Sequence, residues 1–290
     1  MFPAITTPSM LRPGPGLISS QIRLQRRNKD KAHEASGFHG AFSPDPWFKS
    51  LFDDFRELDK SEVAAGYDAG YGFTTVCIST AIYLPWLLGQ CARNGVIFRR
   101  ARLSDISEAQ HLSHTGRPPR FVVNCTGLGA LRLGGVNDTN MAPCRGQTIL
   151  VRNNTPAMLM FSGTEDGPSE ETYVMQRAVG GGTILGGTYE PGNWDPVPDP
   201  NSATRIMKRV VDVCPEIAGG KGVKGLDVVR HAVGFRPFRA GGVRVEKEKR
   251  GDTWIIHNYG HDSWGYLGSY GCAEGVVELL NGAQDVKSRL

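Results

Sequence analysis

The feature that most constrains the fold is a series of short β-rich segments in the second half of the chain. These segments alternate with turns rich in Gly, Pro and Asp, which is typical of strands joined by tight connections. They lie at 148–151, 173–176, 183–185, 228–233 and 243–245. Tight connections favour antiparallel pairing, because a parallel neighbour needs a long crossover. The pattern therefore predicts a mostly antiparallel sheet, interrupted by one helix after Asp199-Pro200.

The segments on either side of this sheet follow a different pattern. Apolar runs at 96–98 and 121–123 each predict a strand, and the second stops at the tight turn 124–127. Near the end of the chain, residues 254–256 predict another strand. A glycine-containing loop at 260–265 and an amphipathic helix follow it. Strands that alternate with helices are typical of α/β folds.

The N-terminal residues show no convincing periodicity. Residues 12–16 have the composition of a loop, and 23–31 form a polar, strongly basic run. We therefore predict that residues 1–46 are disordered or irregular.

Composition narrows the classes of partner. The net charge of +4 is small for 290 residues and is not gathered into a basic stripe, so nucleic acid is not indicated. No apolar run approaches the roughly 20 residues that span a bilayer. Six cysteines at wide intervals without a CxxC pair favour reduced thiols inside a cell: Cys77, Cys91, Cys125, Cys144, Cys214 and Cys272.

Three features could carry chemistry. Arg236 lies between Phe235 and Pro237, and a guanidinium among apolar neighbours needs an anion, which could be a substrate carboxylate or a structural Asp or Glu; simple solvent exposure is the other interpretation. Tyr173 and Tyr189 fit either a site or an ordinary core. The strand, loop and helix around 260–265 fit either an anion site or an ordinary turn.

Five stretches together show a resemblance to a known family. The segment 255–261, followed by Gly265, Gly271 and Ala273, is similar to the signature of the D-amino acid oxidase family. Support comes from stretches in the same order and spacing: 67–70 with 80–87, 123–128, 145–147 and 233–239. The resemblance covers residues from about Trp47 to the C-terminus and is closest to the fungal type.

The resemblance implies a fold class and a domain division. The fold would be α/β (α+β), with the remnant of an FAD-binding Rossmann-like domain interleaved with a mostly antiparallel-sheet substrate domain. The FAD-binding domain would comprise 84–140 and 251–287, the substrate-binding domain 47–83 and 141–250, and a peroxisomal targeting tail 288–290, with 1–46 unassigned.

The resemblance also implies roles for single residues. Arg236 occupies the position that clamps the substrate α-carboxylate, Tyr173 and Tyr189 resemble the two tyrosines that line the substrate site, and the carbonyl of Ser263 would accept from the substrate amino group. Residues expected at the flavin nucleotide are Leu103, Thr126, Asp262, Ser263, Trp264, Gly265, Tyr266 and Leu267. No catalytic acid or base and no metal ligand is expected, because the substrate need only be aligned for hydride transfer to the flavin.

The implied reaction is the oxidation of neutral D-amino acids, with FAD as cofactor and oxygen as second substrate, to 2-oxo acids, ammonia and hydrogen peroxide. The tripeptide Ser288-Arg289-Leu290 matches a peroxisomal address that an import receptor reads, and peroxisomes contain catalase. We therefore expect a peroxisomal protein without a membrane span; a homodimer is left open.

The sequence departs from the family at the N-terminus and in the flavin loop. No GxGxxG occurs in residues 1–50, and Gly14-Pro15-Gly16 follows no apolar strand and contains a proline that cannot donate to a phosphate. Asp262, Trp264 and Leu267 also differ from the usual residues of the loop. A truncated or non-catalytic relative that does not hold FAD, and a D-aspartate oxidase, therefore stand as alternatives.

Overall fold

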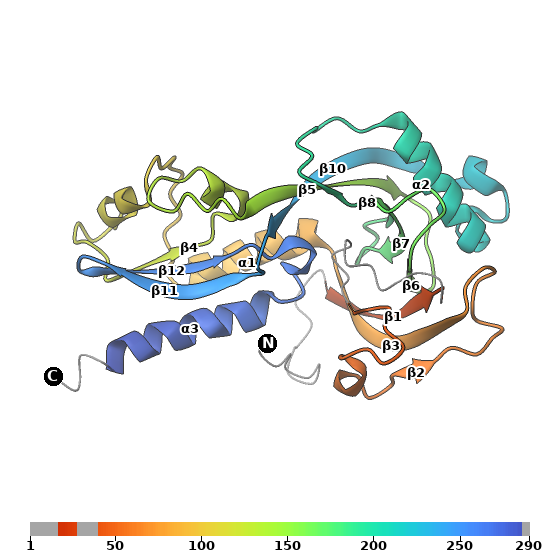
Figure 1. The fold of residues 1–290 in the computed structure, drawn as a ribbon, viewed down its shortest axis with the longest axis horizontal. Helices are drawn as coiled ribbons and strands as arrows, with labels where there is room; N and C mark the ends of the chain where they lie inside the picture. The colour runs from red at the N-terminus through yellow and green to blue at the C-terminus, as the bar shows by residue number, and fades with distance from the viewer. Residues whose placement is uncertain (1–16, 28–39, 286–290) are drawn as a thin grey trace.

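The computed structural model describes residues 17–27 and 40–285, and its strands form two separate sheets (Figure 1). The strands are β1 (Leu17–Arg26), β2 (Arg56–Glu57), β3 (Ala69–Ile78), β4 (Phe121–Asn124), β5 (Met141–Val151), β6 (Met158–Phe161), β7 (Glu170–Gln176), β8 (Thr183–Thr188), β9 (Glu190–Pro191), β10 (Val228–Arg239), β11 (Arg244–Arg250) and β12 (Thr253–Tyr259). The α-helices are α1 (Thr80–Arg93), α2 (Pro200–Val213) and α3 (Ser269–Asp285).

The larger sheet has nine strands in the order β10-β5-β8-β7-β6-β1-β3-β2, with β9 paired to β5. All of its pairs are antiparallel except that of β1 with β6. The prediction of a mostly antiparallel sheet is therefore confirmed for this part of the chain. The second sheet has the order β11-β12-β4, with β12 parallel to β4.

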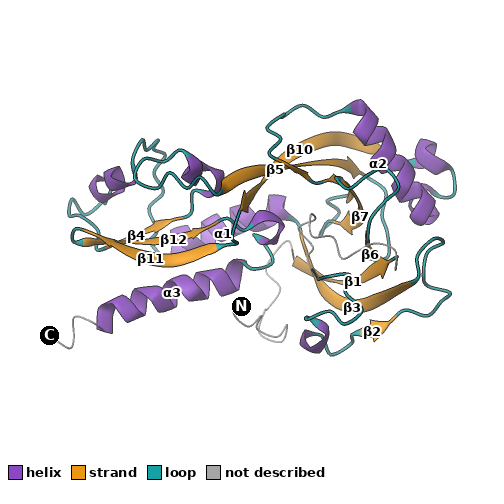
Figure 2. Cartoon of the chain, viewed as in Figure 1, coloured by secondary structure: helices purple, strands orange, loops and turns teal. Residues whose placement is uncertain are grey.

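Helix α2 covers one face of the larger sheet (Figure 2). Asp199 caps its N-terminus by accepting from the backbone N–H groups of Asn201 and Ser202, and Pro200 occupies its first position. Ile206 and Val210 lie one turn apart on the buried side of the helix and are fully buried against the sheet. The helix predicted after Asp199-Pro200 is thus confirmed, and its apolar stripe forms the main core.

The N-terminal segment differs from the sequence prediction. Residues 1–46 were predicted to be disordered or irregular, yet β1 pairs along its whole length with β3 and also with β6. Ile22 and Leu24 of β1 are buried in a core cluster with Phe73 of β3. This long-range pairing, rather than local periodicity, makes the segment a strand, so the prediction was wrong for β1.

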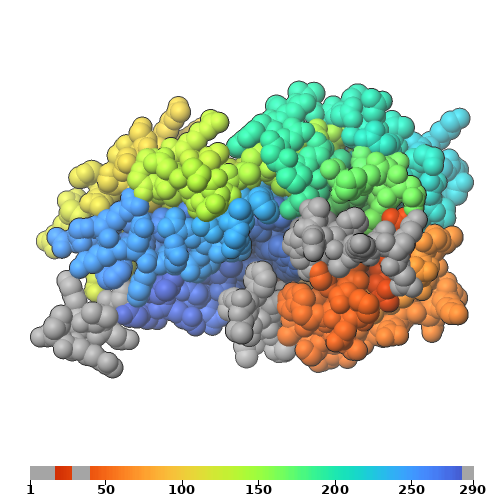
Figure 3. All heavy atoms as spheres, in the orientation of Figure 1, coloured from red at the N-terminus to blue at the C-terminus, as the bar shows by residue number. Residues whose placement is uncertain are grey.

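The smaller sheet lies at the other end of the molecule from the larger one, with α3 alongside β11 and β12 (Figure 1). In the space-filling view the C-terminal residues, in blue, pack together in this part of the molecule (Figure 3). A tight turn joins β11 to β12, so β11, predicted to belong to the substrate domain, lies in the small-sheet part. The strand predicted at 96–98 does not form, because no described strand pairs with it. Pro85 lies inside α1, which begins at Thr80.

The mixed α/β class is confirmed by this architecture. Among the residues that the structure describes, no helix is both long enough and apolar enough to span a membrane. Within the same ranges no cluster of His, Cys, Asp and Glu could hold a metal ion. The six cysteines are free thiols.

Candidate active site

Arg236 is held at the centre of the site by the pairing of β10 with β5. It lies opposite Cys144, and its guanidinium covers the backbone of Gly146, where an added Cβ would come within 2.5 Å of Nη1. Nη1 donates to the carbonyl oxygen of Thr188 at 3.0 Å, and Nη2 donates to Oε2 of Glu171 at 3.4 Å. The sequence stretch 145–147 therefore includes a glycine because the arginine needs that space.

Tyr173 lies on β7 and is buried beside the guanidinium. Its ring covers Gly186 of β8, where an added Cβ would lie 1.9 Å from the ring, so only glycine leaves room for it. Burial raises the pKa of Tyr173 to about 12, while a hydrogen bond with Arg236 acts in the opposite direction. The phenol is therefore neutral at physiological pH and available as a hydrogen-bond donor.

Tyr189 approaches Arg236 from the segment between β8 and β9. The guanidinium carbon lies 5.2 Å from the centre of its ring, a cation–π distance. Its hydroxyl donates to Oδ2 of Asp262 at 2.8 Å. Burial, together with this hydrogen bond, raises the pKa of Tyr189 above its usual range. The structure thus brings Arg236, Tyr173 and Tyr189 together, as the sequence predicts.

The loop after β12 packs against β10 beside this cluster. It contains a short 3-10 helix, Asp262–Trp264, and Asp262 has a positive φ of 48°. Oδ1 of Asp262 and Oγ of Ser263 are buried without a hydrogen-bond partner among the described residues. Tyr266 and Leu267 are exposed, and α3 begins shortly after them. The loop therefore presents unpaired polar atoms on the side of β10, the strand that carries Arg236.

Thr126 and Leu103, the two other residues predicted to contact the flavin nucleotide, do not join the cluster around Arg236. Thr126, at the end of β4, donates from its hydroxyl to Oδ1 of Asn124 at 2.7 Å, and the adjacent Gly127 approaches Pro237 of β10. Leu103 packs in a small separate cluster with Ile106, Leu133 and Ile255. Neither residue has a hydrogen bond or ring contact with Arg236 among the described interactions. Their roles stay predictions.

Glu171 is the site residue that sequence reasoning missed. It lies two positions before Tyr173 on β7, so both side chains face the same side of the strand. Only 8% of Glu171 is exposed, and burial raises its pKa to about 7 even though Arg236 favours the carboxylate. The available signal was its spacing from Tyr173, because residues two apart on a strand share a face.

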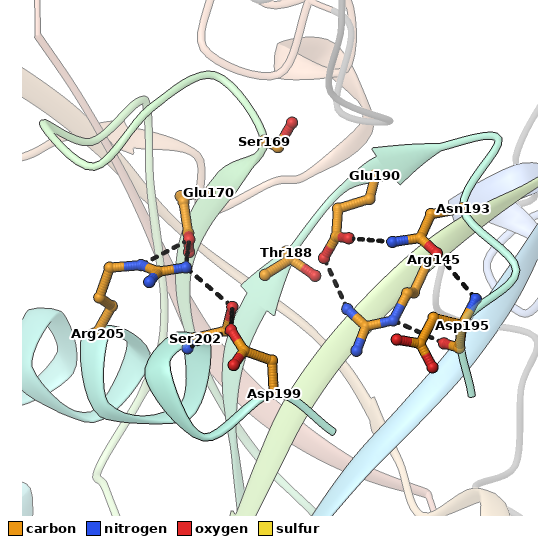
Figure 4. A pocket seen from close by; sticks show the side chains of 10 residues that line it. All are labelled: Arg145, Ser169, Glu170, Thr188, Glu190, Asn193, Asp195, Asp199, Ser202 and Arg205. Carbon is orange, nitrogen blue, oxygen red and sulfur yellow. Dashed lines mark hydrogen bonds and ion pairs between the residues drawn. The ribbon is translucent and has the colours of Figure 1, made fainter. Parts of the chain in front are cut away.

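A separate polar pocket lies beside the N-terminus of α2 (Figure 4). Its lining is Arg145, Ser169, Glu170, Thr188, Glu190, Asn193, Asp195, Asp199, Ser202 and Arg205. Arg145 pairs with Glu190 at 2.7 Å, and Arg205 pairs with Glu170 at 2.6 Å. Arg236 contacts its own carboxylate, Glu171, only at 3.4 Å, so the more tightly paired cations of this pocket make it a less suitable carboxylate site.

Comparisons with known proteins identify the family of this chain. A family model described as FAD dependent oxidoreductase matches residues 25–279. The D-amino-acid oxidase of Fusarium vanettenii is 62% identical over 272 residues, which cover 93% of this chain and 75% of that protein. The chain belongs to the D-amino acid oxidase family. The recognition made from the five sequence stretches is confirmed.

Two relatives at lower identity to this chain have different names. The D-amino-acid oxidase of Schizosaccharomyces pombe is 35% identical over 78% of this chain and 64% of its own length. The D-aspartate oxidase of Cryptococcus neoformans is also 35% identical, over 78% of this chain and 67% of its own length. The chain therefore spans about two thirds of the length of these relatives. The same level of identity does not separate neutral from acidic substrates.

A solved structure supports the fold. Glycine oxidase from Bacillus cereus aligns with a TM-score of 0.65 at 16% identity, over 92% of this chain and 74% of that chain. At this identity the likeness concerns the fold alone. One stretch of this chain, Gly220 to Gly225, has GxGxxG spacing, but it follows the short 3-10 helix Pro215–Ala218 rather than a strand, and its last four residues form another 3-10 helix. It does not have the context of a dinucleotide site.

Proposed function

We propose that this chain carries out the FAD-dependent oxidative deamination of neutral D-amino acids to 2-oxo acids, ammonia and hydrogen peroxide. The observation that carries the proposal is the convergence of a largely buried guanidinium, Arg236, with Tyr173 and Tyr189 in a member of the D-amino acid oxidase family. A planar guanidinium can bind one carboxylate through two parallel hydrogen bonds. The site therefore has the chemistry to hold an amino acid by its carboxylate.

The residues of the site act by orientation. Arg236 binds the α-carboxylate, the neutral phenol of Tyr173 donates a further hydrogen bond, and the carbonyl of Ser263 accepts from the amino group. These contacts fix the direction of the α-hydrogen. Fixed geometry alone can lower the activation barrier by several kcal/mol. The imine formed from the substrate is then hydrolysed to the 2-oxo acid and ammonia. No general base is required of this chain.

The loop at Asp262–Trp264 fits the ring end of FAD, because it packs against β10, the strand of Arg236, and its buried Ser263 hydroxyl has no hydrogen-bond partner among the described residues. Polar atoms of this kind are normally satisfied by a ligand or water. Ser263, Gly265 and the backbone before α3 would hold the cofactor there. When bound, FAD supplies the two-electron acceptor that takes hydride from the α-carbon and passes the electrons to oxygen.

The preference for neutral substrates follows from the charges around the site. A second carboxylate on the substrate would need a second cation, and the two candidates are Arg177 and Arg209. Arg177 lies in the turn after β7, next to Gly181. Arg209 is paired with Asp166 at 2.6 Å and Glu170 at 2.8 Å. A side-chain carboxylate left unpaired would lose several kcal/mol of solvation.

Oxygen consumption tests this proposal. With FAD in excess, the chain should consume oxygen with D-alanine and D-valine and do so more slowly with D-aspartate. Detection of the matching 2-oxo acid and of hydrogen peroxide checks the stoichiometry. Turnover of D-aspartate above that of both neutral substrates would favour the D-aspartate oxidase alternative, and no turnover with any D-amino acid would favour a non-catalytic relative.

The cellular location is part of the proposal. Residues 288–290 lie outside the described residues, and we propose that they direct the protein to peroxisomes through the import receptor. Peroxide formation supports this choice because those organelles contain catalase. A fluorescent protein that ends in these three residues should become punctate with a peroxisomal marker, and replacement of Leu290 should make it diffuse. A diffuse distribution of both would contradict the proposal.

A further inference from the structure

The unexplained feature of the site is Glu171. It is a carboxyl group in direct contact with the guanidinium that the proposed reaction needs for the substrate. Its Oε2 lies 3.4 Å from Nη2 of Arg236, and its Oε1 has no hydrogen-bond partner among the described residues. A buried carboxylate oxygen without a partner is costly. Glu171 therefore lowers the stability of the fold at this position, which points to a role toward the ligand.

The backbone of β7, and not only a side-chain rotamer, determines the face of the sheet on which Glu171 lies. Glu170 and Thr172, its neighbours on β7, face α2, where Glu170 pairs with Arg205 and Thr172 accepts from Arg209. The alternation of side chains along a strand then turns Glu171 to the opposite face. That face also carries Tyr173, next to Arg236.

The charges that face Glu171 determine what it can do. They come from five elements: Arg236 of β10, Asp262 of the loop after β12, Arg209 of α2, Cys144 of β5 and Tyr173 of β7. Arg209 is already paired with Asp166 and Glu170, and the Cys144 thiol is neutral because burial raises its pKa to about 11. Arg236 thus stands as the one positive charge in this set without another carboxylate partner, opposite two acidic groups.

We propose that Glu171 is a specificity-determining residue: it pairs with the guanidinium of Arg236 when no ligand is bound, and it disfavours the binding of ligands that carry a second carboxylate. The inference rests on the proposed function for the identity of the ligand. A ligand carboxylate on Arg236 adds a third acidic group around one guanidinium, and like charges at this distance do not all stay ionised. Each ligand carboxylate raises the pKa of Glu171 and draws a proton to it, and a second ligand carboxylate is repelled both by the charge that Glu171 keeps above about pH 7 and by Asp262, without gaining a cation.

A binding experiment that needs no turnover tests this inference. The probes are pyruvate, with one carboxylate, and 2-oxoglutarate, with two, titrated calorimetrically into the 290-residue chain. Wild type should bind pyruvate about tenfold or more tightly than 2-oxoglutarate, which corresponds to roughly one pKa unit of interaction. Glu171→Gln should lower this ratio and leave only the part that is due to Asp262. Glu278→Gln removes the same charge from an exposed position of α3 and should leave the ratio unchanged.

The pH dependence gives a second readout in the wild type alone. Because ligand binding favours protonated Glu171, pyruvate affinity should be highest below the pKa of about 7 and fall as the pH rises above it, by about tenfold per pH unit. In Glu171→Gln the affinity should be flat over the same range. This arm remains decisive if Glu171→Gln does not fold, since it requires only the native chain.

The outcomes separate the two proposals. A preference for pyruvate that Glu171→Gln leaves intact, a pH-independent affinity in wild type, or no pyruvate binding at all would each overturn the role of Glu171. None of these results bears on whether D-alanine is oxidised in the presence of FAD, which is measured separately. Oxidation of D-alanine with an unchanged ratio in Glu171→Gln would leave the proposed function in place and remove this inference.

Discussion

The two sheets of this molecule differ in how completely they bury their apolar side chains. In the large-sheet part, α2 and the strands beneath it keep Ile149, Val174 and Ile206 fully buried. In the small-sheet part, Ile97 and Phe98 after α1 are 56% and 54% exposed. Neighbouring exposed apolar side chains of this kind are typical of an interface.

The difference has a structural cause. The nine strands of the larger sheet have α2 on one face and a second cluster, with Ile22, Phe48 and Phe73, on the other. The smaller sheet has three described strands, and β4 has a described partner on one side only. Its two core clusters each contain three buried residues. The substrate site therefore rests on the part that packs more completely.

The largest expected effect concerns cofactor affinity and tests the small-sheet part. The 290-residue chain should bind FAD at least about a hundredfold more weakly than a longer version that carries a strand–GxGxxG–helix unit. In the proposed roles the described elements would contact the flavin end, and two or more charge-assisted hydrogen bonds to the phosphates, worth about 1.5–3 kcal/mol each, would be missing. Equilibrium dialysis with FAD measures the difference. A purified chain with one tightly held FAD would show that the small-sheet part is sufficient.

An effect of similar size, confined to the large-sheet part, concerns Arg236. With FAD in excess, Arg236→Ala should lower kcat/KM for D-alanine by roughly 10²–10⁴-fold, because two charge-assisted hydrogen bonds to the carboxylate are lost. Arg236→Lys should recover only part of this loss, since an ammonium does not reproduce the planar fork. Pyruvate binding by calorimetry should weaken in the same order. Retained turnover in Arg236→Ala, with an unchanged circular dichroism spectrum, would show that another group holds the carboxylate.

The smallest effect compares the two parts by stability, with isoleucine in both. Ile206 is fully buried beneath the large sheet, and Ile97 is 56% exposed. Ile206→Ala should lower the free energy of unfolding by about 2–5 kcal/mol through lost burial and a cavity. Ile97→Ala should change it by less than about 0.5 kcal/mol. Urea unfolding followed by circular dichroism measures both. Equal losses of unfolding free energy in the two variants would mean that Ile97 is buried in solution, which would contradict the difference in burial between the two parts.

The sequence predicted the elements that depend on local pattern. The helix after Asp199-Pro200 formed as predicted because its cap and its apolar stripe lie within a few residues of each other. The strands at 121–123 and 254–256 were also predicted from apolar runs and are confirmed as β4 and β12. The strand predicted at 96–98 did not form, since an apolar run becomes a strand only where a partner strand is available.

The sequence by itself therefore determined the family and the fold class, because both are carried by local motifs; it also singled out Arg236, Tyr173 and Tyr189, which the structure brings together and whose roles stay predictions. Tertiary structure decided what depends on contacts between distant segments. It made β1 a strand through β3 and β6, and it placed Glu171 against Arg236, 65 positions away in sequence. The physical reason is that strand pairing and buried charge are properties of neighbours in space, which the spacing of residues along one segment does not specify.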